Sequence, residues 1–231
     1  MRRLGSIQCI EVPADAGTSE SEKRTIILFH GFGADAYDLQ TLSDALPTPW
    51  PVDFLFPQGP LEVPIGPGWT GRAWWKIDML ALQAAGTRGD GVDISNEDPA
   101  GLATVRPQIM KMLDQLGVPW SRLILGGFSQ GAMLATDIFL RAPENPAGLI
   151  IMSGNLICQN AWKELAPKRA GCSFFQSHGK GDAVLGYKGA ARLETLLTQA
   201  GLKGSLQGFN GGHEIPMQTL QGVGQYLKQL K

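Results

Sequence analysis

The chain has 231 residues, of which 43% are hydrophobic and 18% charged, and its formal net charge is −1. These values are typical of a globular protein with a substantial buried core. A nucleic-acid-binding surface is not expected, because no segment of the chain is rich in basic residues.

Strands and helices are predicted to alternate along the chain. Short apolar segments rich in β-formers predict strands at 6–12, 25–30, 52–57, 122–128, 147–154, 172–179 and 203–209. Helical spacing of apolar residues predicts helices at 35–46, 95–116, 130–142, 187–201 and 215–230, with Pro107 expected to kink the second. This alternation predicts a single α/β domain over residues 1–231, with a mostly parallel sheet and helices on both faces.

Residues 57–93 do not follow this alternation, and they are rich in glycine and proline. Long segments without regular structure inside a compact domain are usually functional. We therefore expect a loop over the carboxyl ends of the strands, where ligands bind in such sheets. Aromatic and leucine side chains of this segment could build an apolar trough for substrate or could instead seal the edge of the core. They are Trp69, Trp74, Trp75, Leu80 and Leu82.

The apolar runs and the cysteines bear on where the protein works. The longest apolar runs are far too short to span a bilayer, so no integral membrane segment is expected. The two arginines near the N-terminus are not followed by an apolar run of signal-peptide length. Cys9, Cys158 and Cys172 are an odd, scattered set without metal-ligand spacing, which favours a reducing compartment. We therefore expect a cytoplasmic protein.

The segment GFSQG at 127–131 matches the pattern G-x-S-x-G between a predicted strand and a predicted helix. In that pattern the serine takes a strained backbone conformation, so its hydroxyl stands clear of the sheet. The flanking glycines avoid collisions with the neighbouring chain. Ser129 is therefore the candidate nucleophile.

A serine nucleophile needs a base, and the chain has three histidines. His30 and His178 end predicted strands and precede glycines, which favours structural roles. His213 lies in a glycine-rich loop between the last strand and the last helix, from which an imidazole can reach Ser129. His213 is therefore the candidate base.

The base in turn needs a carboxylate to orient it. Five acids lie between Ser129 and His213: Asp137, Glu144, Glu164, Asp182 and Glu194. Asp182 alone follows directly after a strand end, and the order Ser, Asp, His is that of α/β hydrolases. Asp182 is therefore the candidate acid, and no metal cluster, phosphate-binding loop or cofactor site competes with this interpretation.

An acyl-transfer site also needs backbone N–H donors for the developing oxyanion. The segment HGFGAD at 30–35 follows a predicted strand at the place where such a loop belongs. Position alone assigns the N–H groups of Phe32 and Gln130 to an oxyanion hole.

Taken together, seven segments resemble the phospholipase/carboxylesterase family of α/β hydrolases, which includes the acyl-protein thioesterases. The segments are FHGFGAD, PQGP, WWKID, GGFSQGAML, MSGNL, HGKGDAVL and GGHEIP, in that order along the chain. The resemblance implies the α/β-hydrolase fold, a triad of Ser129, Asp182 and His213, and an oxyanion hole at Phe32 and Gln130.

The leading hypothesis is a cofactor-independent serine hydrolase that cleaves carboxylic esters through an acyl-enzyme on Ser129. Its substrate would be a small-molecule or lipid acyl ester. One alternative is an acyl-protein thioesterase or lysophospholipase, which needs a long apolar trough. Another is a catalytically silent scaffold that binds an acyl compound or a protein. A dienelactone-type hydrolase is disfavoured, because position 129 would then be cysteine.

Overall fold

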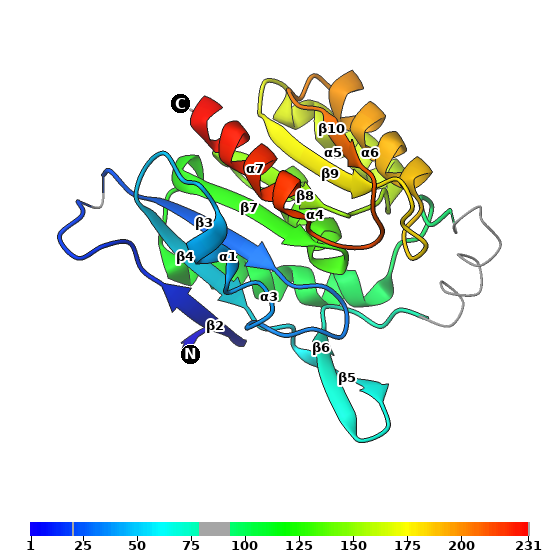
Figure 1. Ribbon diagram of the computed structural model, residues 1–231, viewed down its shortest axis with the longest axis horizontal. Helices are drawn as coiled ribbons and strands as arrows, with labels where there is room; N and C mark the ends of the chain where they lie inside the picture. The colour runs from blue at the N-terminus through cyan, green and yellow to red at the C-terminus, as the bar shows by residue number, and fades with distance from the viewer. Residues whose placement is uncertain (20, 79–92, 231) are drawn as a thin grey trace.

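The computed structural model describes residues 1–19, 21–78 and 93–230. An eight-stranded sheet runs through the molecule in the order β1-β2-β4-β3-β7-β8-β9-β10 (Figure 1). The strands are β1 Arg2–Leu4, β2 Ile7–Val12, β3 Arg24–Phe29, β4 Val52–Pro57, β7 Leu123–Phe128, β8 Gly148–Met152, β9 Phe174–Gly179 and β10 Leu206–Phe209. Strands β4, β3, β7, β8, β9 and β10 pair in parallel in that order, while β2 pairs antiparallel with β1 and with β4. The predicted mostly parallel sheet is confirmed.

Helices cover both faces of this sheet. They are α1 Leu42–Ala45, α3 Ala100–Leu116, α4 Gln130–Arg141, α5 Gln159–Leu165, α6 Tyr187–Gln199 and α7 Met217–Gln229, with 3₁₀ turns at Trp120–Arg122 and Ala166–Arg169. Side chains of α3, α4, α5 and α6 pack in one core cluster, and those of α1 and α7 pack in the other. Alternate residues of the central strands enter opposite clusters, as Leu28 and Phe29 do in β3.

Two predicted helices begin at other residues in the structure. Residues 35–46 form successive turns, with Asp38 N–H bonding to Asp35 O, and only the four residues of α1 are helical. The carboxylate of Asp35 accepts the N–H of Tyr37, a local bond that competes with helix formation. Helix α3 begins at Ala100 rather than near Ser95, with Pro99 extended at its N-cap.

The prediction of a loop over 57–93 is wrong in part, because an antiparallel hairpin occupies its first half. Its strands are β5 Leu61–Gly66 and β6 Trp69–Ala73, and the hairpin projects away from the central sheet (Figure 1). The N–H of Gly33 donates to Arg72 O at 2.8 Å, and the N–H of Arg72 donates to Ala34 O at 2.7 Å. The hairpin is therefore joined to the segment 30–35. Residues 79–92, with Leu80 and Leu82, lie outside the described residues.

Within the described ranges, no helix combines the length and the apolar character needed to cross a membrane. Cys9, Cys158 and Cys172 are free thiols, and the first two are buried. Burial raises the pKa of each of these two thiols to about 12, so both stay protonated at neutral pH.

Candidate active site

Ser129 lies in a sharp turn between β7 and α4, with φ 55° and ψ −119°. A Cβ on Gly127 would lie 2.6 Å from the carbonyl oxygen of Phe29, and one on Gly131 would overlap the same carbonyl group. The two glycines therefore let α4 start directly against β3. The N–H of Ser129 donates to Met152 O at 2.9 Å, which fixes the strained turn to the end of β8.

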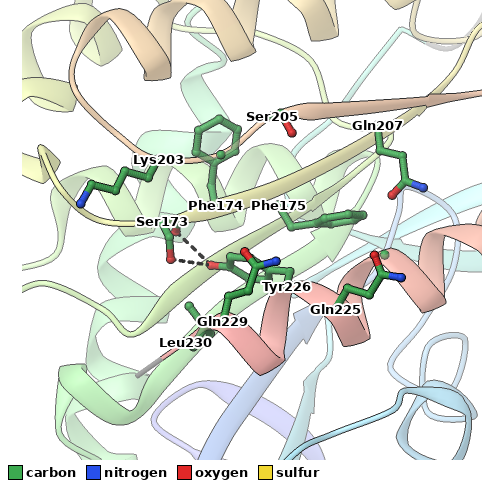
Figure 2. A pocket seen from close by; sticks show the side chains of 12 residues that line it. Ser173, Phe174, Phe175, Lys203, Ser205, Gln207, Gln225, Tyr226, Gln229 and Leu230 are labelled. Atoms are coloured by element: carbon green, nitrogen blue, oxygen red, sulfur yellow. Dashed lines mark hydrogen bonds between the residues drawn. The ribbon is translucent and has the colours of Figure 1, made fainter.

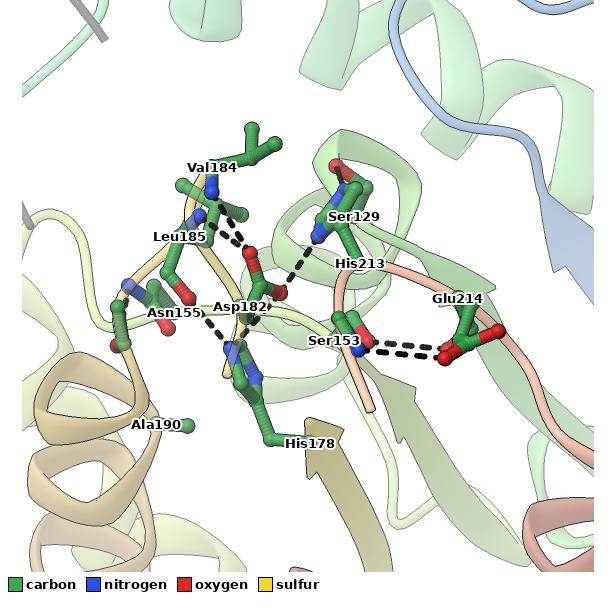
Figure 3. Close-up of polar contacts among 12 residues, drawn as sticks. Ser129, Ser153, Asn155, His178, Asp182, Val184, Leu185, Ala190, His213 and Glu214 are labelled. Carbon is green, nitrogen blue, oxygen red and sulfur yellow. Dashed lines mark hydrogen bonds and ion pairs between the residues drawn. The ribbon is translucent and has the colours of Figure 1, made fainter. Parts of the chain in front are cut away.

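The structure brings Ser129, His213 and Asp182 together in one hydrogen-bonded chain (Figure 3). His213 Nε2 lies 2.8 Å from Ser129 Oγ, and His213 Nδ1 lies 2.6 Å from Asp182 Oδ2. Asp182 follows β9 and His213 follows β10, so the group forms beyond the carboxyl ends of the parallel strands. The side chain of Asp182 is fully buried, while 18% of the His213 side chain remains exposed.

Both oxygens of the Asp182 carboxylate accept two hydrogen bonds each. Oδ1 accepts the N–H groups of Val184 at 2.9 Å and Leu185 at 2.8 Å. Oδ2 accepts from His213 Nδ1 and contacts His178 Nε2 at 3.1 Å. Burial acts to raise the pKa of Asp182, but the hydrogen bonds from His178 and His213 outweigh it and hold the pKa well below its usual range. The carboxylate is therefore held ionised and in a fixed orientation.

The contact from His178 was missed by the sequence analysis, which treated this residue as structural. His178 is fully buried at the end of β9, and its Nε2 also lies 2.5 Å from Leu185 O. Because Nε2 faces two acceptors, it carries the ring hydrogen. The signal in the sequence was the spacing of four residues between His178 and Asp182 across a strand end.

His30 has the structural role that its position indicated. Its Nε2 accepts the N–H of Gly59 at 2.9 Å, and its Nδ1 donates to Gly31 O at 2.7 Å. Burial lowers the pKa of His30 to about 4, which keeps the ring neutral. The ring thus joins the segment 30–35 to the chain that follows β4.

The proposed oxyanion donors both lie near Ser129, since Phe32 lines the same cavity and Gln130 is the next residue in the chain. Within the described chain, neither the N–H of Phe32 nor that of Gln130 donates to another residue. The buried side chain of Gln130 has a second role that the sequence analysis missed. Its Oε1 accepts the N–H of Trp74 at 3.0 Å, and its Nε2 donates to Trp75 O at 2.8 Å. The residue after the serine therefore also holds the segment that follows the hairpin.

The three tryptophans named as substrate-binding candidates lie in three different environments. Trp69 is 72% exposed on β6. Trp74 is buried in the core, and its Nε1 donates to His30 O at 2.9 Å. Trp75 is also buried, but it lines a cavity of about 240 Å³ that shares Met133 and Leu185 with the cavity over Ser129. The structure therefore brings only Trp75 to a cavity near Ser129.

A cavity of about 260 Å³ opens over Ser129 and His213. A larger cavity of about 620 Å³ lies between β9, β10 and the last turns of α7 (Figure 2). It borders the amino ends of those strands, and the hydroxyl of Tyr226 on its wall donates to Ser173 O at 3.0 Å. Because ligands of parallel sheets bind beyond the carboxyl ends, the smaller cavity is the candidate active site. In the part of the chain that the structure describes, no group of three or more His, Cys, Asp or Glu residues could hold a metal ion.

Known proteins resemble this chain over nearly its whole length. The family model of Phospholipase/Carboxylesterase matches residues 12–231. Acyl-protein thioesterase 1 of Neurospora crassa is 28% identical over 89% of this chain and 86% of its own length. Acyl-protein thioesterase 1 of Candida albicans is 26% identical over 97% of this chain and 98% of its own length.

Solved structures share the fold. Esterase PE8 is 25% identical with a TM-score of 0.78, over 97% of this chain and 99% of that chain. The carboxylesterase of Bacillus cereus has a TM-score of 0.74 at 16% identity, over 97% of this chain and 95% of that chain. With the elbow, the strand-end site and the family match in agreement, the chain belongs to the phospholipase/carboxylesterase family of α/β hydrolases and is a hydrolase of ester or thioester bonds.

Proposed function

We propose that the protein cleaves carboxylic esters through an acyl-enzyme on Ser129, with His213 as base and Asp182 as the acid that orients it. One observation carries this proposal: His213 reaches Ser129 Oγ through Nε2 and Asp182 through Nδ1, at 2.8 and 2.6 Å. A ring held between these partners can take a proton from the hydroxyl on one side while the carboxylate stabilises the resulting charge on the other.

The reaction then has two halves. Ser129 Oγ attacks the acyl carbon as its proton passes to His213 Nε2, and the N–H groups of Phe32 and Gln130 bind the oxyanion. Collapse of the tetrahedral intermediate expels the alcohol, which takes the proton from His213. Water, activated by the same imidazole, releases the carboxylic acid and regenerates Ser129. The intact hydrogen-bonded chain favours this enzyme over a catalytically silent scaffold.

Thioesters of acylated proteins, or lysolipids, are the second candidate substrates. The cavity over Ser129 shares Ile77, Met133 and Leu185 with the cavity beside Trp75, and both have mainly apolar walls. Such a pair of cavities could accommodate a longer acyl chain. The names of the relatives, acyl-protein thioesterase 1, favour the same candidate.

Hydrolysis of p-nitrophenyl esters graded from two to sixteen acyl carbons tests the proposal, with Ser129→Ala beside the wild type. A fluorophosphonate probe, which labels activated serines, is applied to both proteins. We expect labelling and hydrolysis in the wild type alone. A maximum at short chains indicates a small-ester substrate, and a maximum at long chains indicates lysolipids or acyl-proteins. Absence of both labelling and hydrolysis in the wild type would contradict the proposal.

We also infer that residues 1–231 act as one domain in the cytoplasm. The eight-stranded sheet contains strands from both ends of the chain, from β1 near the N-terminus to β10 before the last helix, which supports one domain. The free thiols of Cys9, Cys158 and Cys172 suit a reducing compartment. Maleimide labelling of the unfolded protein from fractionated cells counts its reduced thiols. Three are expected if the protein works in a reducing compartment.

A further inference from the structure

The cavity over Ser129 has an almost uncharged wall. Most of the wall is apolar and is formed by Phe32, Ala34, Ile77, Phe128, Met133, Val184 and Leu185. The other lining residues are Gly31, Asp38, Ser129 and His213. Of these lining residues, only His213 and Asp38 can carry a charge. Since His213 is engaged by Ser129 and Asp182, Asp38 is the unexplained ionisable group of the cavity.

Asp38 is an exposed residue at the edge of this cavity. Among the described residues, its carboxylate makes no hydrogen bond or ion pair. The neighbouring Asp35 differs, because its carboxylate accepts the N–H of Tyr37 and so stabilises the turn. Partial burial, and then the charge of Asp35, raise the pKa of the Asp38 carboxyl. Among the described residues, no positive charge thus offsets these two effects on the Asp38 carboxylate.

The adjoining cavity has both acidic and basic residues in its wall. Its described charged lining residues are Lys76, Asp78 and Glu97. In the described wall of the cavity over Ser129 itself, Asp38 is the acidic residue. A small molecule approaching Ser129 therefore passes the carboxylate of Asp38 at short range, which favours cations and disfavours anions.

We propose that Asp38 is a specificity-determining residue that selects esters carrying a cationic group near the scissile carbonyl and disfavours anionic esters. The inference rests on the proposed role of Ser129 and names the substrate class for that site. A cation bound there gains the Coulomb attraction of a carboxylate that pairs with no other side chain among the described residues. We expect a preference of about 2- to 5-fold in kcat/KM, in line with a single partly exposed charge pair.

Two pairs of isosteric esters test this proposal. Choline butyrate and 3,3-dimethylbutyl butyrate differ only by a trimethylammonium or tert-butyl group on the alcohol. Ethyl 4-(trimethylammonio)butyrate and ethyl 5,5-dimethylhexanoate differ in the same way on the acyl side. The readout is the ratio of kcat/KM within each pair, for the wild type, Asp38→Asn and Asp44→Asn. Asp44 is exposed on α1, so Asp44→Asn changes the net charge equally without altering the cavity.

The wild type is expected to prefer the cationic ester in at least one pair, and the pair that shows it identifies the side facing Asp38. In Asp38→Asn that ratio falls to about one, whereas Asp44→Asn retains it, and high salt lowers it in the wild type. Equal rates within both pairs in the wild type, or a preference that survives Asp38→Asn, would overturn the inference while leaving the esterase proposal intact. Hydrolysis of none of the four esters, together with no probe labelling of Ser129, would remove both.

Discussion

His178 Nε2 and His213 Nδ1 converge on the same oxygen of Asp182, Oδ2, at 3.1 and 2.6 Å. The carboxylate is thereby clamped between the base it orients and a second, fully buried imidazole. Together with the two N–H groups on Oδ1, these donors leave the carboxylate little freedom to rotate. His178 is thus placed to act on His213 through Asp182.

Replacing His178 by phenylalanine tests this positioning role. The variant loses one hydrogen bond to a charged group, a loss of about 1.5 kcal/mol, and kcat should fall about tenfold with KM nearly unchanged. Kinetics on p-nitrophenyl butyrate measure both constants, with active-site titration to count folded enzyme. A lower melting temperature with kcat unaltered would show that His178 serves only the fold.

Substitutions of the two buried aspartates Asp137 and Asp182 are expected to affect different properties. A change at Asp137 should lower stability, and a change at Asp182 should lower kcat. Asp137 bonds Arg106 Nε at 2.6 Å, Arg141 Nε at 3.1 Å and Trp162 Nε1 at 3.0 Å, far along α4 from Ser129. Asp137→Ala should lower the free energy of unfolding by about 3–5 kcal/mol, because charged partners lose their counter-ion. Its kcat per folded molecule should stay unchanged.

Asp182→Asn should lower kcat much more than it lowers the free energy of unfolding. Loss of the orienting carboxylate should lower kcat by about 10⁴-fold, the scale found for the acid of a serine triad. Urea unfolding and titrated kcat, measured on both variants, separate the two effects. Equal losses of kcat per folded molecule in the two variants would count against a catalytic role specific to Asp182.

Alanine at Gly131 should destabilise the whole elbow. Its Cβ would overlap the carbonyl of Phe29, so either β3 or α4 must move. We expect a loss of roughly 3 kcal/mol or more in unfolding free energy, together with loss of activity. Gly66→Ala is the matched control, because no heavy atom lies within 4 Å of its added Cβ. Thermal unfolding of both variants measures the contrast, and similar melting temperatures would contradict it.

The neutral, buried His30 should make stability depend on pH in a defined window. Its pKa is lowered to about 4 in the folded chain, against about 6.5 when unfolded, so the unfolded state binds more protons between these values. The contribution of His30 to the free energy of unfolding is therefore fully present above about pH 6.5. It decreases by about 3 kcal/mol as the pH falls toward 4. Urea unfolding of wild type and His30→Gln across this range measures it. The difference between the two proteins should shrink as the pH falls, and a constant difference would contradict the assignment.

The strands and the elbow could be predicted because their residues have few structural options. Apolar runs such as 25–30 and 122–128 are buried on both faces, and glycines at 127 and 131 are required by the approach of α4 to β3. His213 and Asp182 follow from the rule that loops after parallel strands meet at one edge. The structure brings both side chains to Ser129 through that arrangement.

Other elements depend on contacts that the local sequence does not encode. In the hairpin of β5 and β6, one strand is joined to Gly33 and Ala34 by hydrogen bonds between backbone atoms. Such bonds do not depend on side-chain type, so the sequence does not reveal them. Residues 35–46 bury Leu39 and Leu46 through turns, although the same spacing also suits a helix. The role of His178 depends on the direction of its ring at the strand end, which periodicity does not specify.

The positive φ of Ser129 also has a consequence for how this protein evolves. A side chain at φ 55° costs about 1–3 kcal/mol, and glycine at the same position would avoid most of that cost. Glycine there would give a more stable chain without a nucleophile, so stability and reactivity select different residues at position 129. A descendant released from selection for catalysis would be expected to drift toward glycine at that position.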